Sequence, residues 1–303
     1  MPGRTALLVA AGVVAVSFAA IFIRYAEANA LVIAFYRQAM AAAVVLPVVV
    51  LRRRHELRRM TLSQATMAVG SGALLAVHFA TWIPSVKLTT VAASVVLVTS
   101  SPLFVALASQ ALFGERVGHV AIGGIVAGLA GAAIISGGDF ALSSRAVAGD
   151  LLALAGALAA GGYFLAGRRL RQDVSLLTYI GVVYTSCAVL LWPVAVASGG
   201  PLTGFDPTTW AMFVLLALVP QVFGHTAFNY ALKDVSATVV SISIMGEPIG
   251  STVLAMAFFG ETPPWTALLG GALILAGIYV AVTSQARPRR AEREAAPAVT
   301  PLE

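Results

Sequence analysis

The chain has 303 residues, of which 59% are hydrophobic and 11% charged, and it carries a net charge of +6 at pH 7. Soluble domains contain about 25% charged residues, so the composition excludes an ordinary soluble protein and predicts an all-α membrane protein. The single cysteine, Cys187, excludes a disulfide framework and a paired-cysteine metal site.

Ten apolar stretches follow one another, each close to the roughly 20 residues that a helix needs to cross a bilayer. We expect ten transmembrane helices, near residues 5–23, 30–51, 63–86, 90–112, 117–137, 149–166, 175–197, 208–232, 237–259 and 263–284. The first stretch resembles a secretory signal, because Arg4 precedes it and Ala26-Glu27-Ala28 resembles a cleavage site. Its apolar run exceeds the roughly 7 to 15 residues of a signal core, which favours a retained helix.

Lys and Arg residues are distributed unevenly between alternate loops. With a cytoplasmic N-terminus, fifteen of the 19 lie on the cytoplasmic side, and only Arg24, Lys87 and Arg145 lie on the outer side. This asymmetry follows the positive-inside rule and predicts that both termini are cytoplasmic. Topology and contacts with the lipid bilayer therefore explain the positive charge, and we expect no nucleic-acid partner. The tail at 285–303, rich in Ala, Pro and charge, is predicted to be disordered and cytoplasmic.

The two halves of the chain match each other at a fixed offset of 146 residues. The matched positions include Lys87 with Lys233, Pro102 with Pro248, Gly124 with Gly270, and Phe113-Gly114-Glu115 with Phe259-Gly260-Glu261. Each copy holds five helices, an odd number, so the second copy enters the membrane from the opposite side and the repeat is inverted. We place the first repeat at residues 1–137, a linker at 138–146 and the second repeat at 147–284. Inverted repeats favour alternating access to a site near the bilayer midplane.

Two five-helix repeats, each with a proline in its fourth helix and a Phe-Gly-Glu turn thirteen residues later, resemble the drug/metabolite transporter superfamily. The EamA-type branch is the most similar, and the paired segments PLFVALASQALFGE and PIGSTVLAMAFFGE are the most specific part of the resemblance. Within that branch the chain looks most like the YddG group of inner-membrane exporters, which is associated with aromatic amino acids and the cation methyl viologen. The resemblance implies export across an inner membrane, without ATP, through a central cavity between the repeats.

Two ionisable residues inside the predicted helices are candidates for binding a substrate, because such residues are costly in a membrane. Arg37 could attract a substrate carboxylate, or it could cap carbonyl groups and fix the helices. Glu247, directly before Pro248, could bind an ammonium group or exchange a proton, or form a structural hydrogen bond. Ser243 lies one turn from Glu247 and would extend its polar stripe.

A second group of candidates would form the aromatic and polar wall of a cavity. His78 and Trp82 are four residues apart and share a helix face, as do His225 and Asn229. Phe228 matches Trp82 at the 146-residue offset, and we add Tyr163 to this group. Aromatic walls suit a flat ring or a delocalised cation, although single aromatic residues in membrane helices are more often packing residues or interfacial anchors.

Small residues and prolines are expected to shape the scaffold. Gly124, Gly128 and Gly270 would allow close helix approach, and Pro102 and Pro248 would interrupt their helices and free carbonyl groups.

These observations predict a secondary transporter that exports small metabolites, with amino acids as the favoured class. A passive channel or facilitator is the alternative, and an enzyme is disfavoured because no nucleophile or metal-ligand motif is present. No cofactor or metal is expected, and the substrate, the coupling ion and a homo-oligomeric state are left open.

Overall fold

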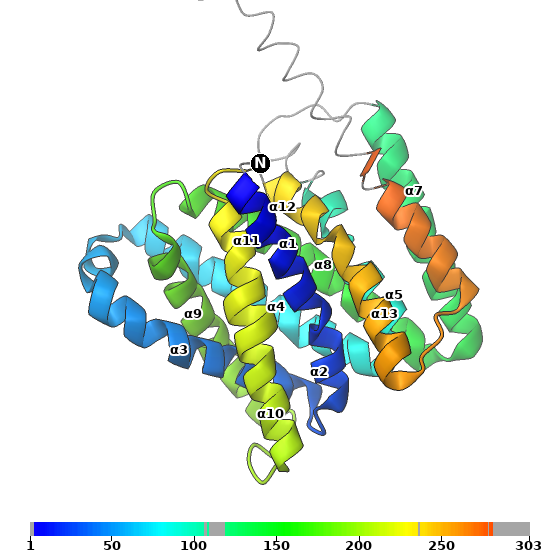
Figure 1. Ribbon diagram of the computed structural model, residues 1–303, viewed down its shortest axis with the longest axis horizontal. Helices are drawn as coiled ribbons and strands as arrows, with labels where there is room; N and C mark the ends of the chain where they lie inside the picture. Colours follow the sequence, from blue (N-terminus) through cyan, green and yellow to red (C-terminus); the bar gives the residue numbers. More distant parts are fainter. Residues whose placement is uncertain (1–2, 106–107, 109–118, 236, 278, 281–303) are drawn as a thin grey trace, which may run out of the picture.

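The computed structural model describes residues 3–105, 108, 119–235, 237–277 and 279–280, and these residues form helices joined by short connections (Figure 1). The helices are α1 (Gly3–Ser17), α2 (Ala19–Tyr25), α3 (Ala30–Arg59), α4 (Leu62–Leu88), α5 (Val91–Val98), α7 (His119–Leu142), α8 (Ser144–Leu170), α9 (Leu176–Ala197), α10 (Pro207–Leu216), the π-helical segment η1 (Ala217–His225), α11 (Thr226–Ala231), α12 (Ala237–Ser243), the 3₁₀ turn η2 (Ile244–Gly246) and α13 (Glu247–Phe259). A further helix spans Trp265–Gly277. The tail at 285–303 lies outside the described residues.

Six helical stretches are long and apolar enough to cross a bilayer: Gly3–Tyr25, Ala30–Arg59, Leu62–Leu88, Ser144–Leu170, Leu176–Ala197 and Pro207–Ala231. Four shorter apolar helices, Val91–Val105, Ile122–Ile135, Ile244–Phe259 and Trp265–Gly277, lie where the remaining spans are predicted. The all-α membrane architecture is therefore supported, while the count of ten crossings stays a prediction.

Hydrogen bonds from polar side chains start several of these helices. The carboxylate of Asp206 accepts from the backbone N–H groups of Thr208 and Thr209 at 2.8 and 3.0 Å, and Pro207 follows it at the first helical position. The Thr209 hydroxyl also donates to Asp206, and these hydrogen bonds hold the pKa of Asp206 below its usual value. Asp206 and Pro207 thus mark the start of α10.

Two boundaries differ from the sequence expectation. Helix α3 continues beyond the apolar stretch ending at residue 51 and carries the arginine cluster to Arg59, where the side chains are exposed. The linker expected at 138–146 is largely helical, because α7 runs to Leu142 and α8 begins at Ser144. Ser143 alone separates the two helices, and its hydroxyl caps α8. Hydropathy detects only the apolar part of a helix, and polar turns that extend it escape detection.

The helices that contain Pro102 and Pro248 are interrupted at equivalent positions. Helix α5 ends at Val98, a turn covers residues 99–100, and the chain is helical again from Ser101. In the second half, the 3₁₀ turn η2 separates α12 from α13. The break therefore precedes each proline, which occupies the first turn of the following segment, where its missing N–H costs no helical hydrogen bond.

The packing between helices follows the same 146-residue correspondence. Helix α4 packs on α8, and its counterpart α10–η1–α11 packs on α1; α3 packs on its own counterpart, α9 (Figure 1). Helix α7 and the helix 265–277 meet at glycines, since a Cβ added to Gly270 would lie 2.5 Å from the Gly131 carbonyl oxygen and one added to Gly277 would lie 2.4 Å from that of Gly124. Gly128 contacts both sides: a Cβ added to it would lie 2.6 Å from Leu103 Cδ1, and its backbone nitrogen lies 2.8 Å from the Cβ position of Gly277. Gly124, Gly128 and Gly270 thus lie at close contacts between helices.

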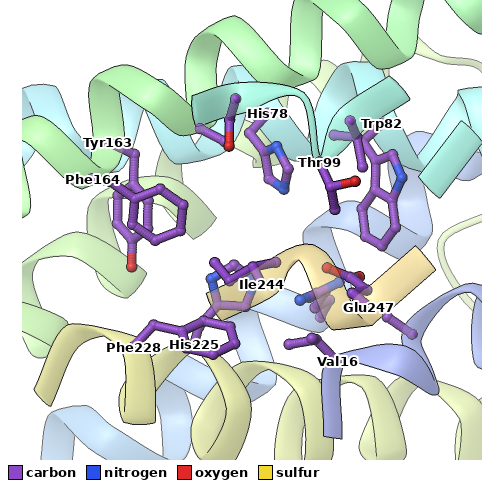
Figure 2. Close-up of a pocket in the computed structure, with 15 residues that line it drawn as sticks. Val16, His78, Trp82, Thr99, Tyr163, Phe164, His225, Phe228, Ile244 and Glu247 are labelled. Atoms are coloured by element: carbon purple, nitrogen blue, oxygen red, sulfur yellow. The ribbon is translucent and has the colours of Figure 1, made fainter. Parts of the chain in front are cut away.

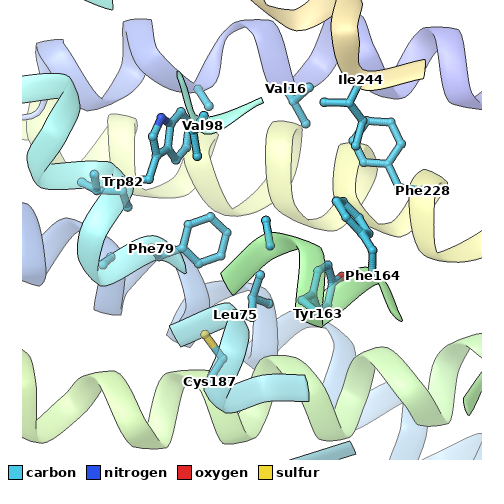
Figure 3. Packing of buried hydrophobic residues seen from close by; sticks show 14 of the residues in the cluster. Val16, Leu75, Phe79, Trp82, Val98, Tyr163, Phe164, Cys187, Phe228 and Ile244 are labelled. Carbon is cyan, nitrogen blue, oxygen red and sulfur yellow. The ribbon is translucent and has the colours of Figure 1, made fainter. Parts of the chain in front are cut away.

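Buried apolar side chains from both halves form one continuous core (Figure 3). Leu75, Phe79, Tyr163 and Cys187 are all at most 1% exposed in the middle of the molecule. The outer surface is apolar as well, with Leu51 and Trp265 among its exposed side chains. An apolar exterior around an apolar core is the arrangement expected of a protein solvated by lipid.

Candidate functional site

An internal cavity lies between the interrupted helices and draws its walls from both halves of the chain (Figure 2). Its lining residues are Val16, Ala19, Arg37, His78, Trp82, Val98, Thr99, Ser101, Ala160, Tyr163, Phe164, His225, Phe228, Ile244 and Glu247. The cavity has a volume of about 40 Å³, which is room for roughly three or four water molecules. Seven of the nine predicted substrate-binding residues are in this lining.

Arg37 brings a cationic group into the cavity wall from α3. Its side chain is fully buried, and Nε donates to Gln221 Oε1 at 3.0 Å. The guanidinium carbon lies 4.1 Å from the centre of the Phe79 ring, a distance at which the ring attracts the cation. The Nη1 group has no hydrogen-bond partner among the described residues. Among the described residues, Arg37 hydrogen-bonds to the side chain of Gln221 and to no backbone carbonyl, so these contacts do not support the carbonyl-capping interpretation.

His78 and Trp82 lie on one face of α4, as their spacing predicts. Their rings stack at 5.7 Å with an angle of 16° between the planes. His78 Nδ1 is 3.0 Å from the Gly156 carbonyl oxygen and so donates to it, which fixes the imidazole against α8. The indole Nε1 of Trp82, by contrast, is buried without a protein acceptor.

His225 is presented from the end of the π-helical segment η1. Its ring centre lies 6.4 Å from that of His78 and 6.3 Å from that of Tyr163, so it faces α4 and α8 across the cavity. Nδ1 of His225 has no protein partner. Single π-helical turns occur frequently at functional sites, and this one also supplies Gln221, the partner of Arg37.

Glu247 is the first residue of α13, directly after the 3₁₀ break. It is 8% exposed and borders the cavity (Figure 2). Within the described ranges, no ion pair within 4 Å joins Glu247 to Arg37; the ion pair found links Arg24 to Glu261 at 3.7 Å. The cavity wall therefore holds a guanidinium group and a carboxyl group that are not in direct contact with each other.

Two predicted residues lie away from the cavity lining. Asn229 is fully buried and pairs with the Tyr163 hydroxyl, which is 2.9 Å from Oδ1 and 2.6 Å from Nδ2. Ser243 is half-buried on α12 and is not among the lining residues. A shared helix face predicts the direction of a side chain but not whether it reaches the cavity.

Several lining residues were not predicted from the sequence. Thr99, Val98 and Ile244 come from the two interruptions, and Phe164 follows Tyr163 on α8. The repeat contains a signal for two of them, because Val98 and Ile244 correspond at the 146-residue offset, as do the lining pairs Trp82 with Phe228 and Ser101 with Glu247. Where one member of a pair lines the cavity, the other is a candidate as well.

Polar contacts join the helices at the end of the bundle that is predicted to face outward. Arg24 Nη2 donates to the Thr89 carbonyl oxygen at 2.7 Å, and Glu261 Oε1 accepts from the Val91 backbone N–H at 2.7 Å. Residues predicted on one side of the membrane thus meet in the structure. For Glu261 this is a helix-end contact, so it has no role at the cavity.

A separate set of contacts joins the end that is predicted to be cytoplasmic. Glu56 accepts from the backbone N–H of Ser175 at 2.6 Å, and Arg168 Nη1 donates to the Leu232 carbonyl oxygen at 2.7 Å. Lys233, adjacent to Leu232, accepts at its carbonyl oxygen from the same Arg168 group at 2.9 Å. The cavity therefore lies between two ends that are each tied by hydrogen bonds.

The model of the EamA-like transporter family matches the chain at residues 3–137 and 147–283. The chain belongs to this family. The match covers nearly all of the sequence, so the protein is a multi-pass membrane protein of a transporter family, and the expected resemblance to the drug/metabolite transporter superfamily is confirmed at this level.

Relatives of this EamA-family protein are mostly described only as transporters. It is 26% identical over 205 residues to an uncharacterized transporter of Archaeoglobus fulgidus, covering 66% of this chain and 70% of that protein. It is 28% identical over 186 residues to a probable terminal-alkyne amino-acid exporter of Streptantibioticus cattleyicolor, covering 61% of each. It is 25% identical to the uncharacterized transporter YdfC of Bacillus subtilis, covering 60% of this chain and 59% of that protein. The finer resemblance to the YddG group is not specifically supported.

A solved crystal structure shares the fold of this EamA-family chain. The two superpose with a TM-score of 0.69 over 95% of this chain and 99% of the other, at 21% sequence identity. Identity this low supports the fold alone.

Within the described residues, no three His, Cys, Asp or Glu side chains gather closely enough to hold a metal ion.

Proposed function

We propose that this protein is a secondary transporter that exports small metabolites, with amino acids as the favoured class, across the inner membrane. Two inverted repeats rock about the central cavity, so that the cavity opens to one side of the membrane at a time. Energy comes from an ion gradient or from the substrate gradient.

The observation that carries this proposal is the cavity between the two interrupted helices. Interrupted membrane helices near the middle of the bilayer are a recurring way to build transporter sites. Three polar atoms from lining residues, Arg37 Nη1, Trp82 Nε1 and His225 Nδ1, lack hydrogen-bond partners in the part of the chain that the structure describes. Each buried unpaired polar group costs about 1–3 kcal/mol, so these groups suit a polar ligand better than a packing role.

The relation between the two halves supports alternating access. The family model matches each half separately, and the packed helix pairs correspond at the 146-residue offset. A structure built from two related halves can exchange their conformations, which gives an inward-open and an outward-open form of similar energy. The small cavity fits this reading, because a free amino acid enters only after the walls move apart.

Aromatic amino acids are the favoured substrates within this class. Trp82, Phe164 and Phe228 provide ring surfaces on different sides of the cavity (Figure 2), and rings bind rings and delocalised cations. One relative is described as a probable amino-acid exporter. Cations similar to methyl viologen are a second substrate class that aromatic walls accommodate.

Uptake into proteoliposomes tests the proposal. The labelled substrates are phenylalanine, tryptophan, threonine and methyl viologen, and the variants are Glu247→Gln and Trp82→Ala. Trp265→Ala is the matched control, since Trp265 is 71% exposed on the outer surface. We expect saturable aromatic uptake that falls at least tenfold in Trp82→Ala and is unchanged in Trp265→Ala.

Counterflow separates a carrier from a passive channel or facilitator. Unlabelled substrate inside the vesicles accelerates entry of labelled substrate through a carrier, because each half-cycle returns the loaded site. Flux that neither saturates nor responds to internal substrate would refute alternating access. Transport of another metabolite, with no amino acid moved, would leave the carrier intact and reject the substrate class.

A further inference from the structure

Arg37 and the polar residues Trp82, Gln221 and Glu247 differ in character from their counterparts in the other half of the chain. Arg37 corresponds to Val183, Trp82 to Phe228 and Gln221 to Leu75 at the 146-residue offset. Glu247 corresponds to the uncharged Ser101. At each of these positions one half carries the polar or charged residue and the other half an apolar or uncharged one, so the part of the scaffold that both halves share does not itself specify these polar groups.

The surroundings of Arg37 leave part of its guanidinium group available. Gln221 occupies Nε at 3.0 Å, and Phe79 covers one face of the group at 4.1 Å. Within the described ranges of the chain, Nη1 has no partner, although the side chain is fully buried. A buried arginine with a free donor is stabilised by an anion that accepts from it, and a carboxylate matches the guanidinium geometry best.

Trp82 supplies a second donor beside the first. Its ring lies 5.9 Å from the guanidinium carbon of Arg37, and both residues line the same cavity. Its Nε1–H group is buried without an acceptor, and an indole N–H can only donate. Stacking on His78, which is itself held by Gly156, fixes the orientation of the indole. Two unpaired donors near one another select an acceptor with two oxygen atoms.

We infer that Arg37 and the indole N–H of Trp82 bind the carboxylate group of the transported molecule. Gln221 is a positioning residue, which holds Nε and directs the remaining guanidinium N–H groups into the cavity. Glu247, which makes no ion pair with Arg37, takes the ammonium end. The substrate class is therefore the amino-acid zwitterion, and an amine or a dication without a carboxylate binds weakly. This inference rests on the proposed transport function.

Competition between matched compounds tests the carboxylate subsite in the wild-type protein. Counterflow of labelled phenylalanine and of labelled tryptophan is measured with added phenethylamine or tryptamine, which lack only the carboxylate. An amine without the carboxylate would leave a charged group of the site without its hydrogen-bond partner, which weakens binding of the amine about tenfold or more. We expect each amine to compete at least tenfold less well than the corresponding amino acid.

Three single variants assign the residues. Trp82→Phe keeps a ring and removes the N–H group, and Gln221→Leu introduces the residue found in the other half. Gln38→Leu is the matched control, because Gln38 is fully buried on α3 beside Arg37, has unpaired polar atoms and does not line the cavity. We expect Trp82→Phe and Gln221→Leu to raise the KM for the amino acid about tenfold, with the maximal rate within twofold. Competition by the amine stays unchanged in both, whereas a general structural defect would weaken amino acid and amine together.

The outcomes separate this inference from the transport function. If none of the labelled compounds enters saturably, the transport proposal itself fails. If transport is saturable but the amines compete as well as the amino acids, the carboxylate assignment is wrong. The same conclusion follows if Trp82→Phe and Gln221→Leu behave like Gln38→Leu. Trp82→Phe decides the question even if Gln221→Leu fails to fold.

Discussion

The hydrogen bond between Tyr163 and Asn229 joins α8 to α11 beside the cavity, and removing it gives a measurable prediction. The Tyr163 hydroxyl lies 2.9 Å from Oδ1 and 2.6 Å from Nδ2 of Asn229, and both side chains are at most 1% exposed. Tyr163→Phe keeps the ring and leaves the buried amide without this partner. A buried group left unpaired costs about 1–3 kcal/mol, and polar pairs between membrane helices average about 0.6 kcal/mol with a maximum near 1.7.

We therefore expect Tyr163→Phe to lower the free energy of unfolding by about 1 kcal/mol, which is a roughly fivefold change in the unfolding equilibrium. The double variant Tyr163→Phe/Asn229→Leu should recover part of the loss, because no unpaired amide remains. Unfolding by sodium dodecyl sulfate in mixed micelles measures the difference. Tyr25→Phe, on a ring that is 40% exposed, is the control. Equal stability of Tyr163→Phe and Tyr25→Phe, or strictly additive losses in the double variant, would show that the pair does not contribute.

The same variant decides whether Tyr163 binds substrate, as the sequence predicts. A hydroxyl that contacts the substrate raises the KM of the folded protein when it is removed. A hydroxyl that only holds Asn229 reduces the amount of folded protein and leaves the KM within twofold. The hydrogen bonds favour the second outcome, because the hydroxyl already has its partner.

Two further predictions concern helix packing and topology. Gly131→Ala places a Cβ atom 2.5 Å from the Gly270 carbonyl oxygen, where ordinary contact begins at 3.4 Å. This overpacking costs about 1–3 kcal/mol and outweighs the roughly 1 kcal/mol gain in helix propensity, so we expect the variant to be less stable. Gly123→Ala on the same helix meets nothing within 4 Å and should be neutral or stabilising, so equal melting temperatures would contradict the close approach. Because Cys187 is the only cysteine and is buried, a membrane-impermeant maleimide applied to intact cells should label Thr203→Cys and spare His55→Cys, and the reverse pattern would overturn the predicted cytoplasmic termini.

The sequence predicts the apolar spans and the relation between the halves because both rest on local or additive signals. Lipid requires about 20 apolar residues for a crossing, so the spans are visible in the composition of each window. The equivalence of Pro102 and Pro248 predicts two equivalent interruptions, and both are present. The sequence does not predict the positions of these interruptions. Each break lies before its proline and does not result from the hydrogen bond that the proline removes.

The direction in which each side chain points could be predicted only in part. A membrane helix is apolar around its whole circumference, so the periodicity that reveals the buried face of a soluble helix is weak. Ionisable residues break this uniformity, which is why Arg37 and Glu247 were identified as candidates and do line the cavity. Asn229 lies outside the cavity lining and pairs with Tyr163, which is 66 residues away in the sequence, a contact that no local pattern indicates. The π-helical segment that carries Gln221 contains Pro220, which disturbs a regular helix but does not by itself indicate a π-helical turn.

Comparison of the two repeats separates residues that build the scaffold from residues that define the site. Gly124 and Gly270 are identical at the offset, and both lie where helix α7 meets its counterpart. Arg37, Trp82 and Glu247 differ from their counterparts, and all three line the cavity. A pseudo-symmetric scaffold favours exchange of conformations between the halves, whereas an asymmetric set of polar groups orients a substrate that has two different ends. An amino-acid zwitterion has such ends, and a symmetric dication does not, so the asymmetry itself argues for the former as the cargo.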